Sequence, residues 1–403
     1  MHAYAAEDPV FRALNALGQA ETDGELGSFC VRCHAPLAVE LGLTTDGLDL
    51  DNVEPHLRGI TCVACHQVDS VEGTHNNPLT YDFGRRLAGP LGDPIRSTVH
   101  RSRYSALVDG RAREHSDVCG SCHDIVTPLG AHIERTYGEW QDSIYVDPDV
   151  GLGCARCHMP GQDGVVAQVP GAPVRRVHDH RMPGVDIALI PFPEADDQRA
   201  AVQEFLDDAI GASLCVQPAE GDGDTLAVVQ LENVAAGHGF PSGATADRRV
   251  WVEVTAWAEG AVAWSSGEIR ADQVVDDVVD PSRWHLHSAM TDTAGGFTHR
   301  FWEAAAIDDS RLLLPHTTLD PTDSAYIDTV QSRQYVVPVA AERIRMALHV
   351  RPLPLDLLEE LVDDGLLEQE VVDAMPTWTV QPTVLEWTAD LPLTDGSLSC
   401  VGQ

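Results

Sequence analysis

The sequence predicts an α+β fold, in which a loop-rich, partly helical domain precedes an antiparallel β-sandwich domain. Three observations support this prediction. Four Cys-x-x-Cys pairs lie between Cys30 and Cys157, in a region rich in Gly, Pro and His with few long periodic runs. After Gly211 the chain changes to β-prone runs separated by turn residues. A segment with the spacing of a helix separates the two regions.

Helices are expected at a few places in the first region. Asp8–Ala20 reads DPVFRALNALGQA, with Pro9 at a position that favours a helix start. Arg135–Ile144, RTYGEWQDSI, is a second candidate. The remaining sequence of this region predicts short helices and long loops.

The domain boundary is predicted where two prolines break the chain. Pro191 and Pro193 are followed by an acidic first turn, by apolar residues at helical spacing and by Gly211 as a stop. We therefore expect a first domain over residues 1–190, a linker helix over residues 191–211, and a β-sandwich over residues 212–403.

The second domain is predicted to be an antiparallel sandwich because its apolar residues alternate. Val250, Val252 and Val254 fall on one face of a strand, whereas the residues between them fall on the other. One helical hairpin, Pro354–Pro376 with Gly365 as the break, interrupts the strands. The expected strands are 225–234, 248–257, 261–269 and 343–353.

A histidine follows the second cysteine in each of the four pairs, although histidine makes up only 18 of 403 residues. A Cys-x-x-Cys pair alone could be a disulfide, a redox dithiol or half of a zinc site. Zinc needs two such pairs per metal but has no use for histidine in that position. Covalent c-type haem does, because the thiols add to its vinyl groups and the histidine becomes the proximal iron ligand. The motifs therefore predict four haem c groups, attached through Cys30, Cys33, Cys62, Cys65, Cys119, Cys122, Cys154 and Cys157, with His34, His66, His123 and His158 as proximal ligands.

The sixth iron ligand decides between chemistry and electron transfer. An open position binds small molecules, whereas a haem with two protein ligands carries electrons. The first half of the chain holds eight further histidines, which is enough to close four irons. From their positions we expect the distal ligands to be His2, His100, His178 and His180.

The remaining composition restricts location and partners. Cys215 and Cys400 are left over, and an even number in an oxidising compartment predicts a disulfide.

The net charge is −37 and all 26 basic residues are arginine, which argues against nucleic acid or an anionic membrane as partner. The sequence contains no run of 18 apolar residues, so no membrane span is predicted. Because haem c is attached outside the cytoplasmic membrane, we expect an export signal before Met1.

Several segments together resemble a known family. The series HAYAAEDPVF, FCVRCHAP, GITCVACH, CGSCHD, ERTYGEW, CARCHMP and HDHRMPG is similar to tetrahaem multihaem cytochromes c related to extracellular cytochrome nanowires. AAGHGFPSG, followed by RRVWVEV, is similar to the β-sandwich fused to many of these proteins. The resemblance implies the same proximal and distal histidines as above. It leaves His238 of GHGFPSG either as a haem ligand or as a residue that only holds its loop.

The predicted function is electron transfer through four covalent haems, without catalysis. The resemblance implies a subunit of an extracellular conductive filament, located outside the cell or at its surface. Its partners would be further copies in a head-to-tail polymer and redox cytochromes or extracellular acceptors. Two alternatives stay open: a monomeric periplasmic electron carrier, and a multihaem oxidoreductase acting on a small nitrogen compound. His2, near the chain start, could ligate an iron of its own chain or of a neighbouring copy.

Overall fold

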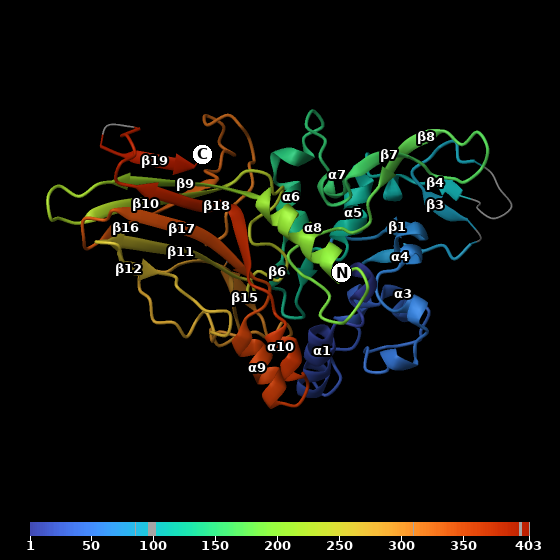
Figure 1. Cartoon of the computed structure of the whole chain (residues 1–403). Helices are drawn as coiled ribbons and strands as arrows, with labels where there is room; N and C mark the ends of the chain where they lie inside the picture. Colours follow the sequence, from blue (N-terminus) through green and yellow to red (C-terminus); the bar gives the residue numbers. More distant parts are fainter. Residues whose placement is uncertain (85, 96–101, 309, 395–396, 403) are drawn as a thin grey trace. The chain divides into compact units, whose positions relative to one another are not determined.

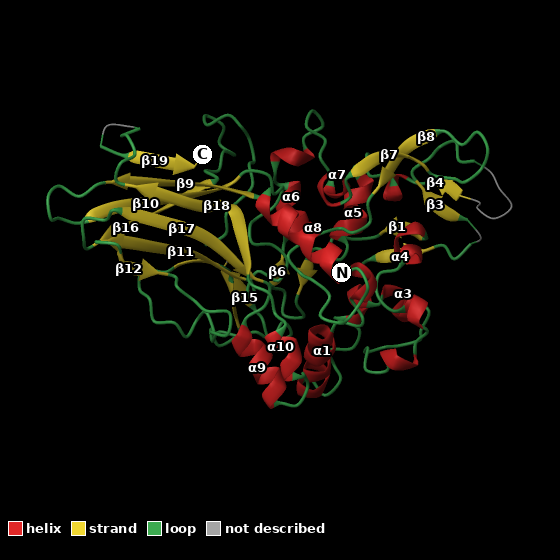
Figure 2. Cartoon of the chain, viewed as in Figure 1, coloured by secondary structure: helices red, strands yellow, loops and turns green. Residues whose placement is uncertain are grey.

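The computed structural model describes residues 1–84, 86–95, 102–308, 310–394 and 397–402. It contains helices and antiparallel sheets, which confirms the α+β class (Figures 1 and 2). The chain forms two compact units, neither of them continuous in sequence. The first comprises Met1–Val202, Thr291–Ala306 and Leu361–Glu368, and the second comprises Gln203–Met290, Ile307–Glu360 and Gln369–Gln403. The longest segment of the first unit therefore ends at Val202, inside the linker predicted over residues 191–211.

The first unit is built from short elements joined by loops. Its two-stranded sheets are β1 with β2, β3 with β4, β5 with β6 and β7 with β8, and only the β3–β4 pair is parallel. Its helices are η1 (His2–Tyr4), α1 (Pro9–Glu21), α2 (Val31–His34), α3 (Pro36–Glu40), η2 (Leu50–Asn52), η3 (Pro55–Leu57), α4 (Cys62–His66), η4 (Ala106–Val108), α5 (Glu114–Gly120), α6 (Thr136–Gln141), η5 (Ile144–Val146) and α7 (Cys154–His158). The strands are β1 (Val68–Val71), β2 (Leu79–Tyr81), β3 (Leu87–Gly89), β4 (Ser102–Tyr104), β5 (Ile125–Val126), β6 (His132–Glu134), β7 (Gly161–Val165) and β8 (Val174–His178).

Helix α1 forms where the sequence predicts it. Asp8 caps its N-terminus by accepting a hydrogen bond from the Phe11 amide at 2.9 Å, and Pro9 occupies the first turn. One face of α1 joins an apolar cluster with Val31 and Leu50. Burial of Phe11 in this cluster places the helix directly against the first Cys-x-x-Cys-His motif.

The second unit holds two antiparallel sheets. The four-stranded sheet has the order β16-β10-β9-β19, and the five-stranded sheet has the order β12-β11-β17-β18 with β13 paired to β11. Their bounds are β9 (Ile210–Gln217), β10 (Thr225–Asn233), β11 (Arg249–Ala258), β12 (Ala261–Ser266), β13 (Trp284–Leu286), β16 (Val330–Val337), β17 (Arg343–Arg351), β18 (Trp378–Thr388) and β19 (Ser399–Gly402). The expected strands at 225–234, 248–257, 261–269 and 343–353 are therefore present as β10, β11, β12 and β17.

Alternation along the strands fills the interior of this unit. Val250, Val252 and Val254 on β11 are fully buried, as predicted for one face. Val229 and Leu231 on β10 are equally buried. The register Val252 opposite Leu348 keeps apolar residues together on neighbouring strands.

The remaining elements lie near the sequence positions at which the chain passes from one unit to the other. Helix α8 (Ala195–Asp207) occupies the predicted linker segment. Helices α9 (Leu355–Asp363) and α10 (Gln369–Asp373) form the predicted helical hairpin, and Gly365 adopts the positive φ of 71° that ends the first of them. Strands β14 (Ala289–Thr291) and β15 (Ala306–Asp308) pair with each other. Within the described residues, no helix is long and apolar enough to span a bilayer.

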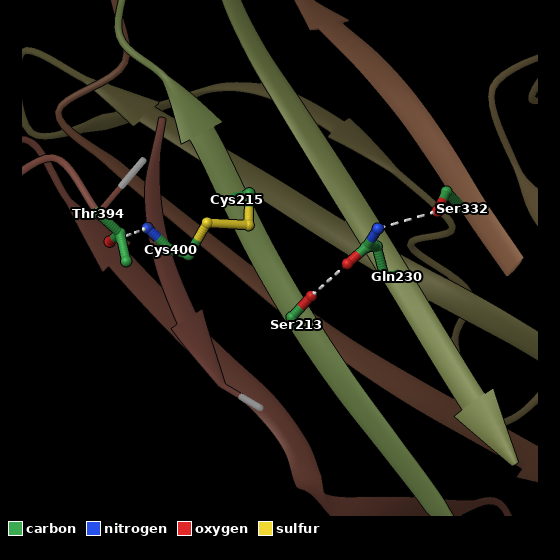
Figure 3. Close-up of a disulfide and its surroundings, with 6 residues drawn as sticks. All are labelled: Ser213, Cys215, Gln230, Ser332, Thr394 and Cys400. Atoms are coloured by element: carbon green, nitrogen blue, oxygen red, sulfur yellow. Dashed lines mark hydrogen bonds between the residues drawn. A yellow bond between two sulfur atoms is a disulfide. The ribbon is translucent and has the colours of Figure 1, made fainter. Parts of the chain in front are cut away.

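A disulfide joins Cys215 of β9 to Cys400 of β19, which confirms the predicted bridge (Figure 3). The two residues are direct partners in the antiparallel ladder although 185 positions separate them in sequence. Cys400 also donates its amide proton to Thr394 Oγ1 at 3.0 Å. The bridge thus fastens the last strand, which has four residues, to the edge of the sheet.

We expect the double substitution Cys215→Ser and Cys400→Ser to lower the free energy of unfolding by about 2–4 kcal/mol. The physical reason is the larger conformational freedom of an unfolded chain without the cross-link. Urea unfolding of oxidised wild type and variant would measure the difference. Equal midpoints and slopes for the two proteins would contradict this prediction.

Candidate cofactor site

Each Cys-x-x-Cys-His motif occupies about one helical turn. Three motifs lie in the short helices α2, α4 and α7, and the third begins at the end of α5. In a helix, residues three and four positions apart share a face. Both thiols and the histidine of each motif are therefore presented on the same side of the turn, where one planar ligand could meet all three.

The four motif histidines share one hydrogen-bond arrangement, in which Nδ1 contacts an oxygen. His34 Nδ1 contacts the Ala5 carbonyl at 3.1 Å, and His66 Nδ1 contacts the Ala88 carbonyl at 2.8 Å. The other two contacts are from His158 Nδ1 to the Pro183 carbonyl, 2.8 Å, and from His123 Nδ1 to Glu134 Oε1, 3.1 Å.

These contacts determine which nitrogen can bind a metal. A carbonyl or ionised carboxylate only accepts hydrogen bonds, so Nδ1 must carry the proton and donate it. The opposite nitrogen, Nε2, is then the one with the lone pair that a metal uses. Metal-binding histidines in proteins show this same outer contact. The donor set of all four motifs therefore fits iron ligation through Nε2.

The thiols of different motifs meet in pairs. A side-chain hydrogen bond joins Cys33 of the first motif to Cys122 of the third, and another joins Cys119 of the third to Cys154 of the fourth. Burial raises the pKa of Cys30 to about 12 and that of Cys65 to about 11. The third and fourth motifs differ, because the contact with Cys33 lowers the pKa of Cys122 and the contact with Cys119 lowers that of Cys154 to about 7.

Zinc is a poor fit for these cysteines. Within the described part of the chain, no group of three or more Cys, His, Asp or Glu side chains is arranged to hold a metal ion. A structural zinc site needs four such ligands in a tetrahedron. The thiols in contact belong to different motifs, whereas the two thiols that would attach one haem belong to the same motif.

Two asparagines fasten the third motif to the first. Asn76 Nδ2 donates to the Val126 carbonyl at 2.8 Å, and Asn76 Oδ1 accepts from the Val126 amide at 3.0 Å. The main-chain N–H of Asn77 donates to the Ser121 carbonyl, and its side-chain Nδ2 donates to the Arg32 carbonyl. Both asparagines adopt positive φ, 57° and 53°, a conformation that asparagine tolerates better than most residues.

The segment ERTYGEW packs directly on the third motif. The ring of Tyr137 lies so close to Gly120 that a Cβ atom there would meet it at 2.2 Å. The Tyr137 hydroxyl donates to Asp117 at 2.6 Å, and its amide donates to the His123 carbonyl at 3.0 Å. The fourth motif joins the same group, because the Cys154 amide donates to Ser116 Oγ at 3.2 Å.

The predicted distal residue His2 lies beside the third motif. The ring centroids of His2 and His123 are 6.0 Å apart and their planes are nearly perpendicular, at 86°. Two imidazole nitrogens that each lie about 2 Å from one metal, the usual metal–imidazole bond length, would place the centroids about 6 Å apart. The observed spacing therefore fits one iron between these two rings of the same chain.

Hydrogen bonds hold the His2 segment in place. The Ile60 amide donates to the His2 carbonyl at 2.9 Å, and the Ala5 carbonyl accepts from His34. Burial, together with the nearby His123 ring, lowers the pKa of His2 to about 3. His2 is therefore neutral at pH 7, the state in which an imidazole can bind a metal. Against burial, which lowers it, the Glu134 carboxylate raises the pKa of His123 to about 9, so this ring is protonated at pH 7 and would have to release its Nε2 proton to bind a metal.

His180 is placed in the same way beside the second motif. Its ring centroid lies 6.4 Å from that of His66, with a smaller interplanar angle of 30°. Its Nδ1 contacts the His178 carbonyl at 2.9 Å, and His178 Nδ1 contacts the Met159 carbonyl at 2.8 Å. Both predicted distal residues of HDHRMPG thus have the same Nδ1 contact as the motif histidines.

His75, His115, His132 and His238 each show at most one of these two features, the ring spacing or the Nδ1 contact with a carbonyl. His100 lies outside the described residues. His115 Nδ1 lies 3.8 Å from the Cys119 thiol, one turn along α5. His75 and His132 lie near each other, with centroids 6.2 Å apart. In the second unit, His238 Nδ1 contacts the Gly239 carbonyl at 2.9 Å, and Asn233 donates to the His238 carbonyl at 2.8 Å.

Comparison with solved structures found a protein of similar fold. The crystal structure of a penta-haem cytochrome c552 from Thermochromatium tepidum matches 89% of this chain and 83% of its own, with a TM-score of 0.59 and 20% sequence identity. This likeness establishes a shared fold over most of both chains. No protein-family model matches the sequence. No curated protein matches it either.

Sequence reasoning missed residues that hold the site together. Glu134 lies inside ERTYGEW, so the segment itself was the available signal, but its contact with His123 depends on strand pairing. Asn76 and Asn77 stand in the turn-like run HNNP, which indicates a left-handed bend without saying what it contacts. The carbonyls of Ala5, Ala88 and Pro183 have no sequence signal, because every residue has one.

We expect Asn76→Ala to lower the free energy of unfolding by roughly 2–4 kcal/mol. The variant loses two hydrogen bonds to Val126 and places alanine in the left-handed region. Asn76→Gly is the matched control, because glycine loses the same bonds but tolerates the positive φ. Denaturant unfolding should therefore rank wild type above Asn76→Gly and Asn76→Gly above Asn76→Ala. A stability of Asn76→Ala equal to wild type would refute the role of this contact.

Proposed function

We propose that this protein transfers electrons through four covalently bound c-type haems. The observation that supports this most is the repeated contact at the motif histidines, since all four have Nδ1 bonded to an oxygen. Two of these rings face a second imidazole at about the spacing that one iron requires. The penta-haem cytochrome of similar fold adds support from an independent direction.

The geometry suggests which rings share an iron. We assign His2 and His123 to one iron and His180 and His66 to another, because each pair has a suitable centroid distance. His178 and His100 are proposed as the distal ligands of the irons at His34 and His158. When bound, each haem supplies a one-electron couple, and two imidazoles leave its iron no open position for substrate.

Contacts between motifs suggest which haems would be neighbours. The third motif touches the first through Cys122 and Cys33, and touches the fourth through Cys119 and Cys154. The segment containing His178, His180 and Pro183 serves both the second and the fourth motifs. If all four motifs bound haem, the third motif would hold its haem beside those of the first and the fourth motifs.

The role of the protein is to hold these groups rigidly. The motif turns are too short to be stable alone, so hydrogen bonds from other segments fix their positions. Fixed neighbouring sites with little reorganisation suit electron transfer better than binding of a substrate. This argues against the alternative enzyme function, which requires an open coordination position.

The family resemblance extends the proposal to a subunit of an extracellular filament. In that case further copies of the chain are its main partners, and redox cytochromes or extracellular acceptors lie at the ends. The placement of His2 against His123 of its own chain favours ligation within the chain, so a filament would need a joint other than His2. Electron microscopy of native material tests this extension: filaments support it, and single particles support a monomeric carrier.

We expect the exported protein to carry four haems per chain, all of them low-spin with two imidazole ligands. Intact-mass spectrometry counts the covalent haems, and optical and electron paramagnetic resonance spectra report spin state. Fewer than four haems, or one high-spin iron per wild-type chain, would contradict the proposed function.

We expect His2→Ala and His180→Ala each to convert one haem per chain to a five-coordinate, high-spin form. Each change removes the imidazole that faces a motif histidine, while both thiols of the motif remain. His56→Ala is the control, because His56 is exposed in the short helix η3 and should leave all four spectra unchanged. Four low-spin haems in His2→Ala would show that His2 is not a ligand in this chain.

A further inference from the structure

One motif histidine differs from the other three in the group that its Nδ1 contacts. His34, His66 and His158 donate to main-chain carbonyls, whereas His123 donates to the carboxylate of Glu134 at 3.1 Å. The contact is no shorter than the other three, and it differs from them in the negative charge of its acceptor. The third motif therefore holds its imidazole through a different interaction from the rest.

The fold fixes the position of Glu134. It ends strand β6, where it pairs with Ile125 of β5 two residues beyond His123. Its side chain is only 12% exposed, and Thr136 Oγ1 donates to the same oxygen, Oε1, at 3.5 Å. Because backbone pairing on β5 sets both ends of the contact, the carboxylate is held beside the ring.

A carboxylate on Nδ1 changes what the ring gives to a metal on Nε2. The negative acceptor draws the Nδ1 proton toward itself and leaves more electron density on the imidazole, which makes the ring a stronger donor. A stronger axial donor stabilises ferric over ferrous iron and so lowers the reduction potential. Main-chain carbonyls are neutral and have a smaller effect.

We propose that Glu134 is a positioning residue that lowers the reduction potential of the haem at the third motif. The inference rests on the proposed function, because it assumes that His123 binds iron. The third motif contacts both the first and the fourth, so a haem bound there would have two neighbours to which its potential matters.

The test uses the exported, haem-loaded protein and three variants. Glu134→Gln keeps an oxygen acceptor near Nδ1 but removes the charge. Glu134→Asp keeps the charge but shortens the side chain, so that the bond to Nδ1 is lost. Glu72→Gln removes the same charge from an exposed position on the same unit and serves as the control. Optical redox titration measures the four potentials, and electron paramagnetic resonance follows each ferric signal.

We expect Glu134→Gln to raise one potential more than the other three. At the wild-type midpoint of that haem, the ratio of reduced to oxidised iron should rise roughly tenfold, which corresponds to about 59 mV for one electron. Glu134→Asp should shift the same haem in the same direction, whereas Glu72→Gln should leave all four potentials unchanged. One ferric resonance signal should change in both Glu134 variants.

Several results would overturn the proposal. An unchanged set of potentials in Glu134→Gln would show that the carboxylate does not tune an iron. A wild-type potential in Glu134→Asp would show that charge near the iron, and not the bond to Nδ1, sets its value. Intact mass and spin state, measured on the same wild-type sample, distinguish a failure of the proposed function from a failure of this inference. If His123 held no haem, the proposed function would fail, whereas four low-spin haems without a Glu134 effect would reject only this inference.

Discussion

Each motif imidazole is held by a hydrogen bond from Nδ1 to an oxygen, and other segments of the first unit provide that oxygen. A histidine side chain rotates about two bonds, so a motif alone does not determine where Nε2 points. The acceptors come from segments distant in sequence: Ala5 near the chain start, Ala88 on β3, Glu134 on β6 and Pro183 after β8. Four ligand directions thus require the correct folding of most of the first 183 residues.

This requirement explains why the first unit has little regular structure. Helical turns of four to seven residues have too few internal hydrogen bonds to be stable in isolation, so side chains from other segments must fix them. Asn76, Asn77, Ser116 and Tyr137 perform this role around the third motif. The third motif consequently contacts its neighbours on two sides, and it is also the motif whose histidine contacts a carboxylate.

Sequence alone predicts the parts of this protein that depend on local patterns. The helix start at Pro9, the alternation of Val250, Val252 and Val254, and the break at Gly365 each follow from a short stretch of residues, and all are present. The bridge between Cys215 and Cys400 was predicted because these two cysteines remain once the four Cys-x-x-Cys-His motifs are assigned. The discontinuous units could not be predicted, because Thr291–Ala306 and Leu361–Glu368 belong to the first unit through packing that no local pattern records.

The candidate site, too, is predictable from sequence only where it depends on a local pattern. The spacing Cys-x-x-Cys-His was enough to predict the attachment residues, because haem c attachment requires these side chains in a fixed order. The partner of each ring depends on tertiary contacts instead. His2 and His180 were expected as ligands, yet only the structure pairs them with His123 and His66. The two pairs also differ in ring orientation, 86° against 30°, and axial-ligand orientation affects the electronic state of a bound iron. The four Cys-x-x-Cys-His motifs therefore differ in their surroundings, because the fold determines the neighbouring imidazole and the outer hydrogen bond of each.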